Sequence, residues 1–133
     1  MAVARRGFLA LAGTAVGLAW ARITPVQKVS TMYGLIGKMT AVAGQRDLLV
    51  SILLGSTQAM PGCLSYVIAK DPTDADALWI TEVWDSAESH KASLGLPAVQ
   101  DAITKARPLI AGFSNRVETE PIGGYGLGKA AAR

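Results

Sequence analysis

The chain has 133 residues, half of them hydrophobic, which is enough for one domain with a substantial core. Its formal net charge is +3, but without Arg5 and Arg6 the 11 remaining basic residues face 10 acidic ones and are scattered along the chain. This pattern argues against nucleic acid as a partner. The single cysteine, Cys63, excludes an internal disulfide framework, and one cysteine with one histidine argues against a zinc or other metal site.

Residues 1–21 are typical of an export signal. Arg5-Arg6 precedes an apolar run over residues 9–20, and Ala19-Trp-Ala21 matches an Ala-x-Ala cleavage site. The run is too short to cross a bilayer, which takes about 20 apolar residues, so we expect no stable membrane anchor after removal of the signal. The paired arginines resemble a twin-arginine signal and predict an exported, periplasmic or otherwise extracytoplasmic protein.

Two alternatives to the twin-arginine route remain open. The segment is also compatible with an ordinary secretory signal, and a cytoplasmic protein could begin at Met32 instead. Residues 22–31 are expected to be a short linker, because they are mostly polar and contain Pro25.

The first predicted elements are a strand over residues 32–41 and a helix over residues 45–60. Gly34 and Gly37 indicate a bulge or a close approach of another segment within the strand. The helix is predicted from apolar residues at helical spacing and should end at Pro61-Gly62.

Two further strands are predicted over residues 63–70 and 77–84. Both alternate with a period of two, and the polar, turn-rich segment 71–76 joins them, so they should form an antiparallel hairpin. Cys63 is then a small, buried residue at the start of a strand rather than a reactive thiol.

The second half of the chain predicts a broken helix and a final strand. Asp85 is the expected N-cap, with Glu88 completing a capping-box pattern, and Pro97 interrupts the helix and begins a new one. A last strand is predicted over residues 112–120, and residues 121–133 form a glycine-rich tail. Two predicted faces follow from these spacings: Val99, Ala102, Ile103 and Ala106 on the new helix, and Phe113, Asn115 and Val117 on the last strand.

The predicted order of elements is β-α-β-β-α-β, which is typical of a ferredoxin-like α+β fold with helices on one face of an antiparallel sheet. The strands are apolar on both faces, and the helices can cover only one face. We therefore expect a homodimer in which the bare faces of two sheets meet.

The best candidate for a functional site lies around the third strand. A period of two places Glu82 and Trp84 on the same face of that strand, and His90 follows in the next helix. An acid, an indole and an imidazole are thereby brought together.

These residues resemble a known family. The segments Met32-Tyr-Gly-Leu-Ile-Gly-Lys38, Pro61-Gly-Cys-Leu-Ser-Tyr66, Glu82-Val-Trp-Asp-Ser-x-Glu-x-His90 and Pro97-x-Val-Gln100 are similar to the antibiotic biosynthesis monooxygenase domain, which includes quinol monooxygenases. The resemblance covers residues 32–120 and implies a dimeric α+β barrel.

The resemblance also implies oxidation of a quinol or related phenolic aromatic by dioxygen without any cofactor. Its site would use His90 as the base, because imidazole is the natural base at neutral pH. Trp84 would supply a stacking wall and Tyr66 a hydroxyl, and Glu82 and Ser93 complete the expected substrate-binding residues.

The sequence departs from many relatives at two positions. Further histidines of the family are replaced here by Ser93 and Ala98, so proton transfer would depend on one imidazole. The haem-degrading branch is not expected, because the positions nearest to its Asn-Trp-His set are Gly37, Ser93 and Ile103.

Structural alternatives remain open for each site residue. His90 could lie on the helix surface or in the core, Trp84 and Tyr66 could belong to the core, and Glu82 could be neutralised by a salt bridge to Arg116. The alternative function is a non-catalytic dimeric barrel that binds a small apolar ligand or serves a stress role. A histidine that faces an enclosed pocket beside Trp84 would favour the enzyme.

Overall fold

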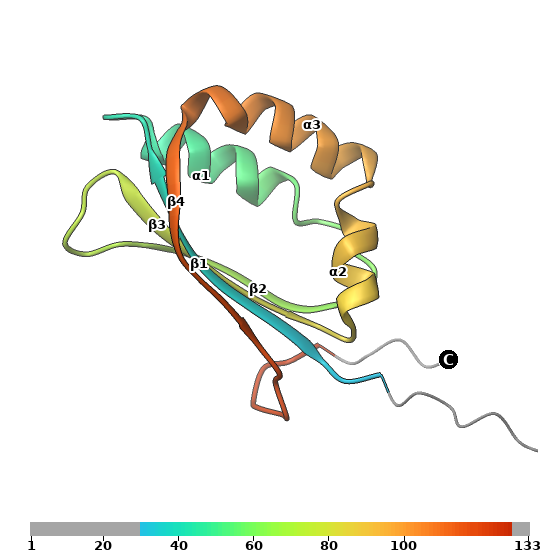
Figure 1. Cartoon of the computed structure of the whole chain (residues 1–133). Coiled ribbons are helices and arrows are strands. Elements are labelled where there is room, and N and C mark those ends of the chain that lie inside the picture. The colour runs from blue at the N-terminus through green and yellow to red at the C-terminus, as the bar shows by residue number, and fades with distance from the viewer. Residues whose placement is uncertain (1–29, 129–133) are drawn as a thin grey trace, which may run out of the picture.

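The computed structural model describes residues 30–128 as a four-stranded antiparallel sheet with the helices on one of its faces (Figure 1). The elements are β1 (Tyr33–Ala41), α1 (Arg46–Gly55), β2 (Cys63–Lys70), β3 (Ala77–Trp84), α2 (Ala87–Ser93), α3 (Pro97–Ala106), the short 3₁₀ turn η1 (Arg107–Leu109) and β4 (Ile110–Thr119). The expected export signal over residues 1–21 lies outside the described residues. None of the helices within the described range is long and apolar enough to cross a membrane.

The strand order in the sheet is β2-β3-β1-β4, and all neighbouring strands are antiparallel. The hairpin of β2 and β3 is confirmed, as is the predicted βαββαβ order. The ferredoxin-like α+β fold predicted from the sequence is therefore confirmed.

The core lies between the sheet and helices α1 and α3. Leu49 of α1 and Leu78 of β3 are fully buried there, and Ala106 of α3 is 2% exposed. Each buried leucine contributes about 1.5–3 kcal/mol to stability. The predicted stripe of α3 is confirmed, since its alanines Ala102 and Ala106 are buried against the rest of the core.

Two helix ends differ from the prediction. Helix α1 ends at Gly55 rather than at residue 60, because the hydroxyls of Ser56 and Thr57 donate to the last carbonyls of the helix at 2.8 and 2.9 Å. The N-cap of α2 is Ser86 and not Asp85: Ser86 Oγ accepts from the Ser89 amide at 3.1 Å. Both errors arise because neighbouring polar side chains compete for the same backbone groups at the ends of the helices.

A β-bulge in β4 overturns the predicted alternation of its side chains. Ile36 of β1 pairs with Val117, but Lys38 pairs with Ser114, so two residues of β4 lie opposite Gly37. The bulge residue Asn115 has a φ of 50°, a conformation that asparagine tolerates better than most residues. The placement of residues 113, 115 and 117 on one face was therefore wrong.

The glycines of β1 behave as expected. Gly37 faces the bulge, and a Cβ at Gly34 would overlap Thr119 Oγ1 and lie 2.9 Å from Pro121. Gly34 thus allows the chain after β4 to cross β1. That segment continues to Gly128, whose amide donates to the Leu64 carbonyl of β2 at 2.7 Å.

The face of the sheet opposite the helices carries an apolar row across all four strands. Cross-strand pairing aligns Val67, Thr81, Ile36 and Val117. Val67 and Val117 are 52% and 51% exposed, so this row is only partly covered within the described part of one chain.

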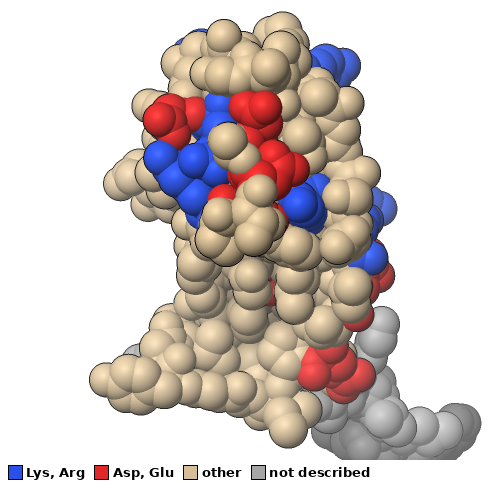
Figure 2. Space-filling view, turned by 90° about the vertical axis from the view of Figure 1, so that its left-hand side faces the viewer, with Lys and Arg blue, Asp and Glu red and all other residues tan. Residues whose placement is uncertain are grey.

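The end of the molecule at the β2–β3 loop is held by a polar network. Asp71 accepts from the Thr73 amide at 2.8 Å and from the Trp79 indole at 2.9 Å, and it pairs with Lys38 at 3.1 Å. These donors, the Thr73 amide first, hold the pKa of Asp71 well below its usual range. Figure 2 shows basic and acidic side chains intermingled at this end, so the patch has no single sign.

Candidate functional site

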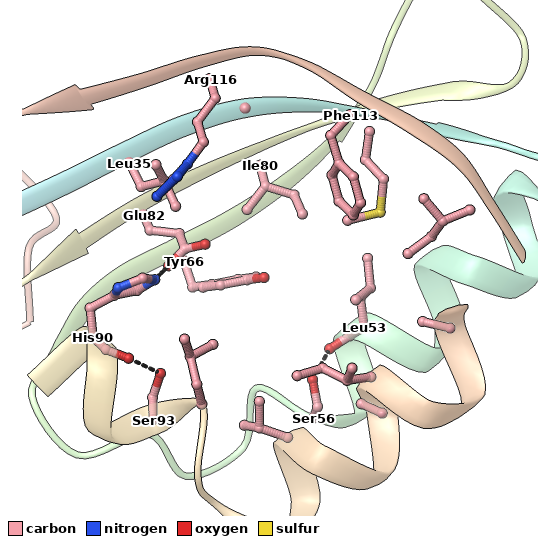
Figure 3. Close-up of a pocket in the computed structure, with 18 of the residues that line it drawn as sticks. Leu35, Leu53, Ser56, Tyr66, Ile80, Glu82, His90, Ser93, Phe113 and Arg116 are labelled. Atoms are coloured by element: carbon pink, nitrogen blue, oxygen red, sulfur yellow. Dashed lines mark hydrogen bonds and ion pairs between the residues drawn. The ribbon is translucent and has the colours of Figure 1, made fainter. Parts of the chain in front are cut away.

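A cavity of about 670 Å³ lies between the covered face of the sheet and the helices (Figure 3). This volume is in the usual range for small-molecule sites. Most of its wall is apolar, with contributions from the sheet and the helices that include Leu35, Met39, Leu53, Ile80, Ile103 and Phe113.

Polar side chains gather at one end of the cavity. They come from all the surrounding layers: Tyr66 from β2, Glu82 from β3, His90 and Ser93 from α2, and Arg116 from β4. The register explains part of this grouping, because Tyr66 and Glu82 are direct cross-strand partners. All five residues proposed from the sequence, Tyr66, Glu82, Trp84, His90 and Ser93, therefore line the same cavity.

His90 packs against two aromatic rings and faces a carboxylate. Its ring centroid lies 5.0 Å from that of Tyr33 and 5.5 Å from that of Trp84, which it meets edge-on. Its Nε2 lies 3.7 Å from Glu82 Oε2, and only 16% of its side chain is exposed. His90 is thus a cavity residue and not a residue of the helix surface.

Glu82 is nearly buried, with 9% of the residue exposed. Its Oε2 accepts from the Trp84 indole nitrogen at 2.8 Å. Burial raises the pKa of Glu82, and the Trp84 hydrogen bond, His90 and Arg116 oppose this rise without cancelling it. The carboxylate is therefore a stronger proton acceptor than an exposed glutamate.

The alternative of a salt bridge from Glu82 to a lysine or arginine such as Arg116 is not realised among the described residues. Arg116 donates to Glu118 at 2.9 Å, and Glu118 also accepts from the Tyr33 hydroxyl at 3.0 Å. The Arg116 side chain nevertheless extends from β4 toward the polar end of the cavity (Figure 3). The bulge places it on this face together with Phe113.

Trp84 belongs mainly to the core, since it is 1% exposed. It touches the cavity wall, but its chief contribution to the site is the indole N–H that fixes Glu82. The core alternative for Trp84 is therefore correct.

Tyr66 and Ser93 differ in the hydrogen bonds they can offer. The Tyr66 hydroxyl points into the cavity (Figure 3), and burial and the nearby Glu82 raise the pKa of Tyr66, so the hydroxyl remains a donor. The Ser93 hydroxyl donates to the His90 carbonyl at 2.6 Å, which leaves its oxygen only as an acceptor for a ligand.

The sequence does not indicate the positions of two residues at the site. Tyr33 shares a face of β1 with Leu35 and is the cross-strand partner of Trp84. It was missed because the register of β1 against β3 does not follow from the β2–β3 hairpin. Arg116 was considered only as a salt-bridge partner of Glu82. Its place in the cavity wall was missed, because strict alternation puts it on the face opposite to Phe113 and the only signal for the bulge is Asn115.

The remaining question about the site concerns its cysteine and any possible metal ligands. Cys63 is half-buried, and burial raises the pKa of its thiol, in agreement with a structural role. Among residues 30–128 no group of three or more His, Cys, Asp or Glu is placed to hold a metal ion.

An antiparallel sheet covered on one face by helices, with a cavity that has one polar end, defines a ferredoxin-like α+β domain suited to a small amphipathic molecule. Residues 32–105 match the family model of the antibiotic biosynthesis monooxygenases, and the chain belongs to this family.

Solved structures support this assignment. A protein from Chloroflexus aurantiacus J-10-fl, named as an antibiotic biosynthesis monooxygenase, is 65% identical, with a TM-score of 0.72 over 74% of this chain and 100% of that one. PA3566 from Pseudomonas aeruginosa is 19% identical, with a TM-score of 0.63 over 72% and 99% of the two chains. A point mutant of SnoaB, a cofactor-independent oxygenase from Streptomyces nogalater, is 12% identical, with a TM-score of 0.60 over 72% and 98%. Comparison with curated proteins returned no match.

Proposed function

We propose that this protein is a monooxygenase that oxidises a quinol or related phenolic aromatic with dioxygen and needs no cofactor. The observation that supports the proposal most directly is the position of His90, which faces an apolar cavity beside Trp84 and Glu82. Membership of the monooxygenase family agrees with it, and SnoaB provides a cofactor-independent oxygenase with the same fold.

The chemistry requires a proton acceptor in a dry aromatic environment. A phenolate is far richer in electrons than the phenol, so loss of the proton allows it to donate an electron to dioxygen directly. The apolar wall excludes water, and Glu82 and His90 provide basic groups at the polar end. The Tyr66 hydroxyl and the Arg116 guanidinium can stabilise the anion.

The overall reaction balances without an external reductant. A quinol and one molecule of dioxygen give a hydroxyquinone and one water: one oxygen atom enters the ring, and the other leaves with two hydrogens of the substrate. The four electrons that reduce dioxygen all come from the quinol.

Oxygen uptake with a panel of hydroquinones and polyphenols tests the proposal. The expected result is uptake with at least one quinol, insensitive to chelators and accompanied by a hydroxyquinone product. The apolar character of most of the cavity wall also suits a protein that only binds its ligand. Tight binding of aromatic molecules without oxygen uptake by any of them would support that second function.

We also propose that the protein is an exported homodimer. The apolar row on the open face of the sheet supports the dimer. Export is supported by the pattern of residues 1–21 alone, and the intact mass of the protein from its native host tests it. A mature chain that begins near Arg22 is expected, and a cytoplasmic product that begins at Met32 would contradict export.

A further inference from the structure

The two carboxylate oxygens of Glu82 have different surroundings. Oε2 accepts from the Trp84 indole and faces His90 Nε2. Among residues 30–128 no hydrogen-bond donor lies within reach of Oε1. Oε1 nevertheless retains some exposed surface, since Arg46 Nε is the one fully buried side-chain polar atom without a partner in this part of the chain. Because Glu82 lines the cavity, its free oxygen is accessible from there.

The orientation of His90 restricts what the imidazole can do. Its Nε2 faces the negatively charged Glu82 at 3.7 Å, and a bare lone pair on that nitrogen would be repelled by the carboxylate. A proton on Nε2 is favoured instead, since it then lies between nitrogen and oxygen. His90 is thus arranged to hold a proton toward Glu82 rather than to take one from the cavity through Nε2.

We infer that Glu82, rather than His90, is the catalytic residue that accepts the phenolic proton of the substrate, through its free oxygen Oε1. The substrate O–H bond breaks, an O–H bond forms at Oε1, and the electron pair stays on the phenolate oxygen. His90 and Trp84 are positioning residues, because they hold Oε2 and leave Oε1 toward the cavity. This inference rests on the proposed function and specifies its first step.

The charged and titratable groups around Glu82 agree with this role. β2 contributes the neutral Tyr66 hydroxyl and the Cys63 thiol, whose pKa the nearby Glu82 helps to raise. α2 contributes His90 and β4 contributes Arg116, whereas the partner on β1 is the apolar Leu35. A phenolate formed here meets three positive or proton-bearing groups, and the neutralised Glu82 no longer repels it. The raised pKa of Glu82 makes the proton transfer easier.

Glu82→Gln is a sharp test because Trp84 fixes the orientation of the new amide. The indole N–H keeps the amide oxygen on its own side, so the NH₂ group faces the cavity and a donor replaces the acceptor. His90→Gln is the comparison variant, since it removes the imidazole but leaves Glu82 in place. Glu88→Gln is the matched control, because it removes one exposed carboxylate of the helix that carries His90.

The first measurement needs no turnover. Calorimetry under argon compares the binding of naphthohydroquinone with that of its dimethyl ether, which has no proton to donate. A hydrogen bond to a charged group is worth about 10- to 100-fold in affinity, so wild type, Glu88→Gln and His90→Gln should prefer the quinol by about that factor. Glu82→Gln should lose the preference and keep its affinity for the ether.

The second measurement is oxygen uptake as a function of pH. Glu82→Gln should lower turnover by about 10²–10⁴-fold and abolish the acid limb of the rate profile, whereas His90→Gln should retain that limb. The inference would be overturned if the acid limb of the rate profile disappeared in His90→Gln but not in Glu82→Gln. It would also be overturned if folded Glu82→Gln still preferred the quinol to its ether. A different result is that wild type binds the quinol through Glu82 and yet consumes no oxygen. That result would refute the proposed function, but Glu82 would still be the group that accepts the hydrogen bond of a bound phenol.

Discussion

At the scale of single residues, His90 connects the carboxylate to the surrounding aromatic side chains. Tyr33 and Trp84 fix its ring, and its Nε2 faces Glu82. Removal of the imidazole therefore disturbs the position and charge of Glu82 more than it disturbs packing, because the ring lines a cavity and not the core.

His90→Ala should lower quinol-dependent oxygen uptake by about 10²-fold, the usual effect of misplacing a catalytic group, because Glu82 loses the imidazole that faces its Oε2. The melting temperature should change little, since the shortened side chain only enlarges the cavity. Oxygen uptake and thermal unfolding of the same preparation check both parts. A variant that is fully active, or one that loses activity only in proportion to unfolded protein, would contradict a functional role.

Most of the site could be predicted at this scale because local rules determine it. Alternation in β3 and the short connection to α2 bring Glu82, Trp84 and His90 together, whatever the rest of the fold does. Arg116 could not be predicted, because its direction depends on a one-residue bulge. The possible salt bridge from Arg116 to Glu82 does not form, because Glu118, two residues along β4, binds the guanidinium instead.

At the scale of elements, the turn that enters β2 depends on Gly62. Its φ is 83°, and a Cβ there would lie 2.5 Å from Ser89 Oγ and 2.8 Å from Asp85 Oδ1. The turn thus packs directly on the cap of α2, the helix that carries His90. Gly44 has a similar φ of 76°, but no atom lies within 4 Å of its Cβ position.

Gly62→Ala should destabilise the protein by more than Gly44→Ala. Gly44→Ala adds only backbone strain, about 1 kcal/mol, whereas Gly62→Ala adds the overlap with α2 and should cost about 2–4 kcal/mol. Urea unfolding of both variants gives the comparison. Equal losses would show that contact with the α2 cap does not matter.

The β2–β3 loop gives the protein a specific acid sensitivity. Because the pKa of folded Asp71 is lowered, its ionised form contributes stability at pH values above its unfolded pKa of about 4, and this contribution is lost as the pH falls through the folded value. Asp71→Asn should therefore melt at a lower temperature than wild type at pH 7.

The difference in melting temperature between wild type and Asp71→Asn should shrink as the pH is lowered from about 5 to about 2. Asp101→Asn is the control, because Asp101 forms an exposed pair with Lys105 and should have almost no effect. A difference that stays constant over the whole pH range would assign the loss to packing and not to the charge of Asp71.

The strands could be predicted better than the helix ends. Strands β2 and β3 have the predicted bounds, since their alternation is regular except for one register shift between Cys63 and Ser65. The end of α1 and the cap of α2 depend on which of several adjacent hydroxyls or carboxylates bonds to the backbone, and their sequence signals are nearly equal.

At the scale of the whole molecule, the open face of the sheet bears on assembly. The helices cover one face of the sheet and leave the other open (Figure 1). The row of Val67, Thr81, Ile36 and Val117 runs across this open face. A face-to-face homodimer would bury this row and leave the cavity of each subunit on the outside of the pair.

Light scattering at micromolar concentration should give the mass of a dimer, and Val67→Glu should shift it toward the monomer, because an unpaired charge would be buried in the interface. Val42→Glu is a suitable control, since Val42 is 43% exposed and lies beyond the end of β1. A well-folded wild-type monomer would contradict the proposed assembly.

The bulge in β4 also bears on the colloidal behaviour of the protein. An edge strand with ten residues in regular register is a template to which another chain can add, and such addition begins aggregation. The left-handed Asn115 breaks that register halfway along β4, while the amide of Gly128 occupies part of the opposite edge at Leu64. The distortion that turns Arg116 into the cavity thereby also protects this edge from strand addition.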